Sequence, residues 1–252
     1  LILWPEQPAP IEYAMQPVFQ VMTADLISRS HATFLFDQVT YKLTATGGLD
    51  LSQPHNSAQL IRPNGTTGER YDKIHLVPFG EYVPLPHWLQ SLLGASKLVQ
   101  DVGDFVPGHE LTLFHLGGHR FAALICYESI FPQLARAETR KGAEWLVNLS
   151  DDSWYGHSSA QAQGLMMART RAIENHRWLL RDTDNGITAV ISPYGRVKAE
   201  LPRDQAGQLT AAFQPLTRLT FYTRHGDWFA YACCLVVLVL LGFAAIKRAW
   251  VK

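Results

Sequence analysis

Short runs of apolar residues alternate with longer amphipathic stretches along most of the 252-residue chain. Short apolar runs bounded by polar residues indicate buried strands, and apolar positions that recur every three or four residues indicate helices. Strands are predicted at residues 1–4, 33–36, 121–125, 145–148, 178–181 and 187–192, with a last pair ending near residue 213, and helices at 17–29, 131–141 and 160–176. Strands that alternate with helices are typical of a layered α/β domain.

A β-hairpin is predicted in the first third of the chain. Residues 57–62 and 69–74 have strand patterns, and the turn between them contains Asn64-Gly65. Asn-Gly tolerates the positive φ that tight turns require. A short helix with an apolar face at 87–93 is predicted after the hairpin, and core packing, a lid or contact with a membrane surface would each explain that face.

The last apolar run differs from all the others because it is long and uncharged. Residues 228–246 would span roughly 29 Å as a helix, about the thickness of a bilayer's hydrocarbon core. We therefore predict a transmembrane helix, with a buried core helix as the alternative. Lysine and arginine follow the run, which favours a cytoplasmic C-terminus and a globular part outside the cytoplasm, although two arginines on the other flank oppose this orientation. The predicted organisation is a globular domain at 1–214, a juxtamembrane linker at 215–227, the span at 228–246 and a basic tail at 247–252.

The composition excludes several classes of function. Lysine and arginine total 22, as do aspartate and glutamate, so no overall field favours nucleic acid. Cys233 and Cys234 are adjacent in the apolar run, which leaves Cys126 without a plausible disulfide partner. Cysteine and histidine show no metal-ligand spacing. We predict no nucleic-acid partner, no metal and no cofactor.

Cys126 lies at a predicted strand-to-helix junction, where a cysteine can act as a nucleophile. The reactive form is the thiolate, so a catalytic cysteine needs a base or a cation beside it. Two ionisable residues follow other predicted strands: Glu6 after the first strand and Lys73 at the hairpin. Taken singly, each of the three residues is more typical of surface or core than of catalysis. His176 would suggest a Cys-His pair, but it is on the predicted core face of its helix and is interpreted as structural.

The order Glu6, Lys73, Cys126 resembles the Glu-Lys-Cys triad of the nitrilase (carbon-nitrogen hydrolase) superfamily. Three longer segments are similar to its membrane-embedded branch, the apolipoprotein N-acyltransferases: YDKIHLVPFGEYVPL at 71–85, ICYESIFP at 125–132 and NLSDDSWYG at 148–156. The resemblance covers roughly residues 1–214. It implies a nitrilase-like α-β-β-α sandwich, incomplete at its N-terminus, followed by one C-terminal transmembrane helix.

The resemblance also implies roles for individual residues. Glu6 would be the general base, Lys73 would stabilise the oxyanion, and Cys126 would carry the acyl group as a thioester. The other matched positions are Glu81 and Glu128, which would support the active site, and Tyr82, Tyr127 and Trp154, which would shape an acyl pocket or pack in the core.

The implied reaction moves an acyl chain from a phospholipid, typically phosphatidylethanolamine, to the N-terminal amine of an S-diacylglyceryl-cysteine apolipoprotein. The implied location is the bacterial inner membrane, in a multi-pass protein whose catalytic domain faces the periplasm. Two departures stand out: the family's membrane bundle and the domain's first strand and helix are expected before residue 1, and Asp151 occupies a position where asparagine is more frequent. The alternatives are a nitrilase-type amidase that hydrolyses a C–N bond and an inactive membrane-bound fragment or scaffold.

Overall fold

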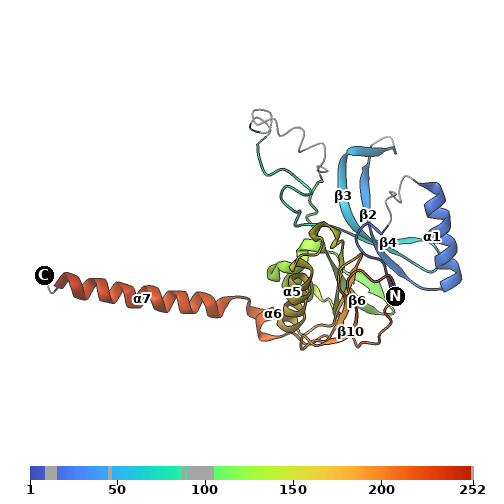
Figure 1. Ribbon diagram of the computed structural model, residues 1–252. Helices are drawn as coiled ribbons and strands as arrows, with labels where there is room; N and C mark the ends of the chain where they lie inside the picture. Colours follow the sequence, from blue (N-terminus) through green and yellow to red (C-terminus); the bar gives the residue numbers. More distant parts are fainter. Residues whose placement is uncertain (9–15, 45–46, 87–88, 90–104, 251–252) are drawn as a thin grey trace.

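Two β-sheets stack face to face, and helices cover their outer faces (Figure 1). The structure is a computed structural model that describes residues 1–8, 16–44, 47–86, 89 and 105–250. The layer order is therefore α-β-β-α, which confirms the predicted fold class. The short helix predicted at 87–93 lies outside the described residues, apart from Leu89.

The first sheet holds the N-terminal half of the candidate site. Its strands are β1 (Ile2–Leu3), β2 (Phe34–Leu43), β3 (Leu49–Ile61) and β4 (Thr67–Asp72), hydrogen-bonded in that order. β1 is parallel to β2, whereas the other neighbours are antiparallel, so the predicted hairpin is present as β3 and β4. Helix α1 (Pro17–Ser30) covers the outer face, where Ile27 packs with Phe34 and Phe36.

The second sheet carries the candidate nucleophile. Its strands are β5 (Phe114–Leu116), β6 (His119–Ile125), β7 (Trp145–Ser150), β8 (Leu179–Thr183), β9 (Thr188–Ile191) and β10 (Val197–Leu201), in the order β10-β9-β8-β7-β6-β5. The central strands β6, β7 and β8 are parallel, so their carboxyl ends meet at one edge. Short 3₁₀ helices follow two of them, η2 (Cys126–Ile130) after β6 and η3 (Ser153–Tyr155) after β7.

Alternating side chains of the strands build the core on both faces of this sheet. In β6, Phe121, Ala123 and Ile125 point between the sheets, where they meet residues of β2, β3 and β4. Ala122 and Leu124 point the opposite way, toward α4 (Pro132–Lys141) and α5 (Ala160–Asn175). The second sheet is therefore buried on both faces, as the continuous apolar run of β6 predicts.

Three details differ from the sequence predictions. β2 and β3 extend well beyond the predicted 33–36 and 57–62, because their polar residues pair in a long ladder that hydrophobicity does not reveal. The last strand pair is β9 with β10, and no strand is assigned from residue 202 to 220, a fully described segment. His176 is not on a core face: it ends α5 in a left-handed conformation with a φ of 50°, and its ring packs edge-on against Tyr194.

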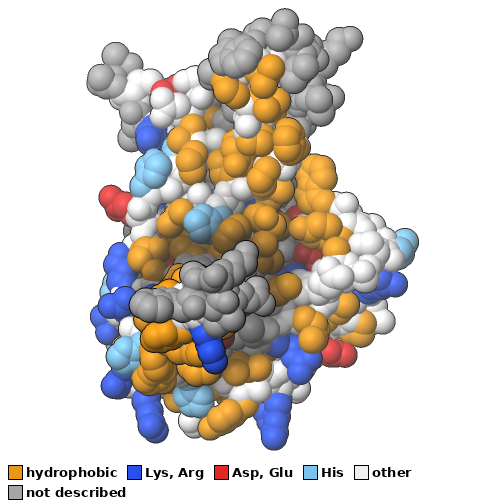
Figure 2. Space-filling view, turned by 90° about the vertical axis from the view of Figure 1, so that its left-hand side faces the viewer, with side chains coloured by type: hydrophobic (Ala, Val, Ile, Leu, Met, Phe, Trp, Pro, Cys, Tyr) orange, Lys and Arg blue, Asp and Glu red, His pale blue; other side chains and the backbone are white. Residues whose placement is uncertain are grey.

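Helix α7 (Trp228–Trp250) projects away from the domain (Figure 1). Its segment Trp228–Lys247 is long and apolar enough to cross a membrane, and none of it is buried by the rest of the chain. Figure 2 shows the molecule from the side on which α7 emerges: hydrophobic side chains extend upward from the helix, and lysine and arginine lie mostly at the lower and left edges. The charge-free run is thus available to a bilayer.

A short helix, α6 (Phe221–His225), attaches α7 to the domain. The Arg136 guanidinium of α4 donates hydrogen bonds to the backbone carbonyls of Tyr222 and Arg224, at 3.2 and 3.1 Å. The fully buried Thr223 bonds the Asn175 side chain at 3.1 Å. α6 is therefore fixed to both helices of the outer layer, and α7 begins three residues after it.

Candidate active site

Cys126 occupies a tight turn between β6 and η2. Its φ of 48° is in the left-handed region, which is unfavourable for a residue with a Cβ. Strained backbone of this kind persists only where surrounding contacts enforce it, and such positions cluster at functional sites. The turn holds the thiol at the carboxyl edge of the parallel strands, where loops from β7 and from the first sheet converge.

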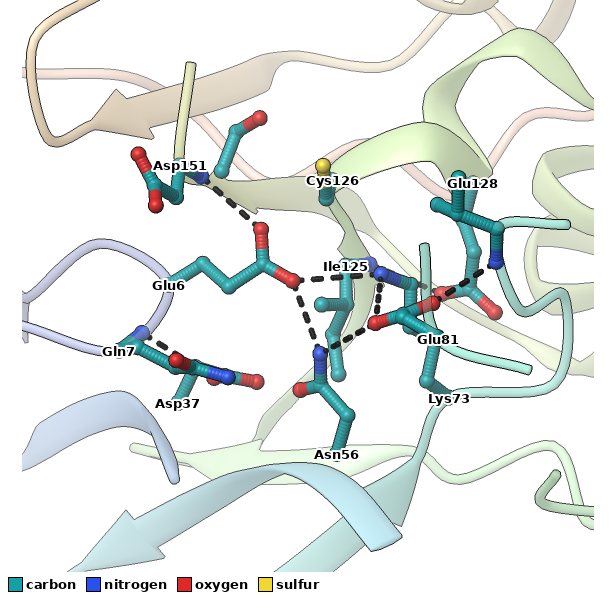
Figure 3. Close-up of polar contacts among 12 residues, drawn as sticks. Glu6, Gln7, Asp37, Asn56, Lys73, Glu81, Ile125, Cys126, Glu128 and Asp151 are labelled. Atoms are coloured by element: carbon teal, nitrogen blue, oxygen red, sulfur yellow. Dashed lines mark hydrogen bonds and ion pairs between the residues drawn. The ribbon is translucent and has the colours of Figure 1, made fainter. Parts of the chain in front are cut away.

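Glu6, Lys73 and Glu81 form a buried charged network next to Cys126 (Figure 3). The Lys73 ammonium lies 3.2 Å from Glu6 Oε1 and 2.8 Å from Glu81 Oε1, and its side chain is 1% exposed. The Asn56 amide on β3 donates to both carboxylates, at 2.8 and 2.9 Å. Three segments far apart in sequence thus converge on one cation.

The backbone fixes the remaining carboxylate oxygens of this network. Glu6 Oε2 accepts the Asp151 N–H at 2.9 Å, and Glu81 Oε2 accepts the Val77 N–H at 2.8 Å. A carboxylate whose two oxygens each accept hydrogen bonds is held in one orientation. Glu6 therefore presents one face to Lys73 and reaches the loop after β7 with the other.

The electrostatics keep Lys73 charged and Cys126 neutral at rest. Burial lowers the pKa of Lys73. The nearby Glu6, Cys126 and Glu81 raise it by more than burial lowers it, so the pKa of Lys73 is above that of an ordinary lysine. Burial and the Glu6 charge raise the pKa of the Cys126 thiol well above its usual value, against the opposing effects of Lys73 and a Ser150 hydrogen bond. A thiol in this state could act as a nucleophile only if a neighbour took its proton as the new bond formed.

Glu128 ties the turn at Cys126 to the loop after Lys73. Its Oε1 accepts hydrogen bonds from the Tyr71 hydroxyl and from the N–H groups of Ile74 and His75, at 2.8, 2.7 and 3.0 Å. Its Oε2 accepts the Ile125 N–H at 2.8 Å. Burial raises the pKa of this fully buried carboxyl, whereas its hydrogen bonds lower it. One side chain thus links the residues next to Lys73 with the residue before Cys126.

A cavity of about 200 Å³ opens beside Cys126, between η2 and α5. Of the three aromatic residues predicted to shape an acyl pocket, Tyr127 lines this cavity. Tyr82 and Trp154 are not among its lining residues, and Trp154 is 84% exposed. Tyr155, the residue after Trp154, contributes to the wall instead.

Residues 38–220 match the family model described as carbon-nitrogen hydrolase, which is well over half of the chain. The chain belongs to the carbon-nitrogen hydrolase family. Two solved structures agree with this assignment at the level of fold. Two mutants of the amidase from Nesterenkonia sp. AN1, a member of the nitrilase superfamily, superpose with TM-scores of 0.57 and 0.58, at 17% identity in each case. Both matches cover 80% of this chain and 75% and 73% of the amidase chains.

Within the carbon-nitrogen hydrolase family, the chain is similar to curated apolipoprotein N-acyltransferases. It is 35% identical to the protein of Geobacter metallireducens over 249 residues, which cover 99% of this chain and 46% of that protein. The identity to the Pseudomonas aeruginosa PAO1 protein is 33% over 251 residues, or 99% of this chain and 45% of that one. The resemblance expected from the sequence is confirmed, and the chain spans about half the length of the curated relatives it matches.

Asp151, the departure from the expected asparagine, fits this carbon-nitrogen hydrolase site through its backbone. Its N–H is the group that contacts Glu6, and its side-chain Oδ1 accepts the Ser153 N–H at 2.8 Å. An asparagine carbonyl oxygen can accept the same bond. The aspartate therefore preserves the local turn.

Sequence reasoning missed several buried polar residues of the site. Asn56 bridges two carboxylates, and Arg181 pairs with Asp152 at 2.7 Å with both side chains 2% exposed. The Arg181 guanidinium also bonds the Asn148 side chain, and Ser150 donates to Asp152 at 2.7 Å. The sequence does contain one signal for this group: Arg181 interrupts the apolar run of β8. A charge within a buried strand needs a partner, so a paired acidic residue could have been expected. Among the described residues, no group of three or more histidine, cysteine, aspartate or glutamate side chains is placed to hold a metal ion.

Proposed function

We propose that this chain is the catalytic part of an N-acyltransferase, which moves an acyl chain from a phospholipid through a Cys126 thioester to an apolipoprotein N-terminus. The observation that carries the proposal is the placement of Cys126 beside the buried Glu6–Lys73 ion pair. The similarity to apolipoprotein N-acyltransferases and the exposed apolar helix α7 support lipid substrates.

In the first half-reaction, Cys126 attacks the ester carbonyl of a phospholipid. Glu6 takes the thiol proton as the C–S bond forms, because the raised pKa of the thiol prevents spontaneous ionisation. Lys73 stabilises the negative charge that develops on the carbonyl oxygen. The C–O bond to the glycerol then breaks, Glu6 returns the proton to that oxygen, and a lysophospholipid leaves.

In the second half-reaction, the neutral α-amine of an S-diacylglyceryl cysteine attacks the thioester. Glu6 takes a proton from the amine nitrogen while Lys73 again stabilises the oxyanion. The C–S bond breaks, and the proton passes to the sulfur, which restores the thiol and releases the amide. Glu81 holds Lys73 in place during both halves, and Asn56 holds Glu6.

Both substrates are lipids, so an anchor in the bilayer brings the site to them. We infer that α7 crosses the bacterial inner membrane with the catalytic domain on the periplasmic side, within a multi-pass protein. Apolar residues beside the site would also restrict water, which competes with the amine for the thioester.

The test uses the complete gene product purified in detergent. It is incubated with phosphatidylethanolamine, and intact-protein mass spectrometry measures the adduct. We expect the mass to increase by one acyl group, a Cys126→Ala variant to show no increase, and a diacylglyceryl-cysteine peptide to remove the adduct as it becomes N-acylated.

Two outcomes would contradict the proposal. Release of fatty acid at the same rate with and without peptide, together with hydrolysis of simple amides, would favour the amidase alternative. Absence of any adduct on Cys126, in protein whose unfolding transition shows it to be folded, would favour an inactive binding or scaffold protein.

A further inference from the structure

The chain turns sharply directly after Glu6. β1 and β2 remain hydrogen-bonded as far as Trp4, whose N–H donates to the Leu35 carbonyl at 3.0 Å. Gln7 then has a φ of 46°, in the left-handed region that is unfavourable for a residue with a Cβ. Surrounding contacts have to enforce such a conformation. Because Glu6 immediately precedes this turn, the contact that fixes Gln7 also fixes the direction of Glu6.

Asp37 is the side chain that holds Gln7 (Figure 3). Its Oδ1 accepts the Gln7 N–H at 3.2 Å. Strand alternation places Asp37 on the same face of β2 as Leu35, which packs between the sheets. Asp37 is 1% exposed and lies next to Glu6 in the close-up view. A side chain of β2 thus holds the chain where the backbone pairing of β1 has ended.

The surroundings of Asp37 favour its neutral form. Its Oδ2 is buried and has no hydrogen-bond partner among the described residues. A buried charge that is incompletely paired is costly, so the protonated acid is favoured. Burial and the Glu6 charge raise the pKa of Asp37 well above its usual value, against the opposing effects of Lys73 and the Gln7 hydrogen bond. A neutral Asp37 adds no second negative charge beside Glu6 and still offers one oxygen to Gln7.

We propose that Asp37 is a positioning residue for the general base: by accepting the Gln7 N–H, it holds the turn that directs Glu6 toward the Cys126 thiol. The inference rests on the proposed function, which makes Glu6 the base. Without the acceptor oxygen, Gln7 relaxes to an ordinary φ, and Glu6 is displaced from the place where it takes the thiol proton. Asn56 still bonds Glu6, so the reaction becomes slower and does not stop.

The test measures how fast iodoacetamide alkylates Cys126 in the complete gene product in detergent. The C–S bond forms, iodide leaves and the thiol proton passes to the base, so the reaction needs no lipid. Peptide mass spectrometry separates Cys126 from Cys233 and Cys234. With Glu6 in position, the rate should be nearly flat from about pH 6 to 8. Without an aligned base only the thiolate reacts, and the rate should rise about tenfold per pH unit.

The variants separate the acceptor oxygen from the shape of the side chain. Leucine and asparagine both resemble aspartate in shape, but only asparagine has an acceptor oxygen. Asp37→Leu should lower the rate near pH 7 about tenfold and make its pH dependence steep, whereas Asp37→Asn should stay within about threefold of the wild type with a flat profile. Adding Gln7→Gly to Asp37→Leu should restore part of the rate, because glycine adopts a positive φ without strain.

The matched control is Asp25→Leu, the same substitution on α1 at a side chain that is 55% exposed. Its rate and pH profile should equal those of the wild type. Asp37→Ala removes the acceptor with less bulk than leucine, and it replaces Asp37→Leu in the comparison if that variant does not fold.

Four results would overturn the inference. Asp37→Leu could be folded and keep the wild-type rate and profile, or Asp37→Leu and Asp37→Asn could lose equally, so that the acceptor oxygen would not matter. The double variant could be no faster than Asp37→Leu, so that the conformation of Gln7 would not be what Asp37 holds. The wild type itself could have a steep profile, so that Glu6 would not take the proton.

The same measurements distinguish this inference from the proposed function. If the expected pattern of alkylation rates appears but phosphatidylethanolamine never acylates Cys126, the phospholipid function fails and the role of Asp37 stands. If phosphatidylethanolamine acylates the wild type and folded Asp37→Leu equally fast, with equal alkylation profiles, the role of Asp37 fails and the acyltransferase proposal stands.

Discussion

Replacing Glu128 by glutamine should loosen the connection between the nucleophile and the lysine loop. Glutamine keeps the shape of the side chain but has one acceptor oxygen and one donor group. If its oxygen takes the place of Oε1, Tyr71, Ile74 and His75 keep their acceptor, and the Ile125 N–H faces an amide NH₂ where it now has an oxygen at 2.8 Å.

The expected cost follows from these four bonds. A buried N–H without an acceptor costs about 1–3 kcal/mol, and each remaining bond to a neutral oxygen is weaker by roughly 1 kcal/mol than one to a charged oxygen. Relief from burying the charge offsets part of this sum. We expect a net loss of about 2–4 kcal/mol, which a protein of ordinary stability of about 5–15 kcal/mol tolerates.

The assay is urea unfolding in detergent, followed by tryptophan fluorescence, together with the rate of Cys126 acylation at a temperature where the variant is folded. The matched control is Glu200→Gln, the same substitution at an exposed position, which should stay within about 0.5 kcal/mol. If Glu128→Gln unfolds like the control and acylates at the wild-type rate, Glu128 does not hold the two loops together.

Three other substitutions test the charges and the packing around the site. Lys73→Met should lower the acylation rate by about 10²–10³-fold if the ammonium stabilises the oxyanion, and a normal single-turnover rate would refute that role. Burial raises the pKa of Glu138 to about 8, so its contribution to stability is fully present below its unfolded pKa and is lost as the pH rises through 8. Glu138→Gln should remove this loss in thermal unfolding measured from pH 5 to 9, and an unchanged pH slope would contradict the assignment. Gly186→Ala should lower the melting temperature, because its Cβ would clash with Asp152 Oδ2, whereas Gly242→Ala meets nothing within 4 Å; equal effects would show that the Asp152–Arg181 pair adapts freely.

The layers and the order of the main elements could be predicted because the buried strands are short apolar runs. β6 and β7 are visible in the sequence as apolar runs. The strand-to-helix junction at Cys126 follows from the residue at which β6 ends. β3 could not be delimited in this way. Its second half is buried yet includes His55, Asn56 and Ser57, whose polar groups meet other polar groups instead of water.

The convergence of Glu6, Lys73 and Cys126 could be predicted only as a resemblance. Nothing in the spacing of three residues along the chain specifies that the ends of β1, β4 and β6 meet, because the stacking of two separate sheets decides it. The role of Asn56 is harder still to predict, since no sequence pattern distinguishes one amide side chain from its polar neighbours in the same strand. Trp154 shows that the resemblance can also mislead. Its position in a segment that resembles the family predicts that it shapes a pocket, but in the structure its side chain is exposed at the surface.

If α7 crosses a bilayer, as proposed, the attachment of α6 to the domain gives it a mechanical role beyond anchoring. Arg136 and Thr223 fix α6, and α7 begins three residues after it, so the joint is much shorter than a loose linker would be. The tilt of α7 in a bilayer then determines the height and heading of the Cys126 cavity above the lipid surface. Bilayer thickness, which changes helix tilt, would in this way control how readily an ester bond reaches the thiol.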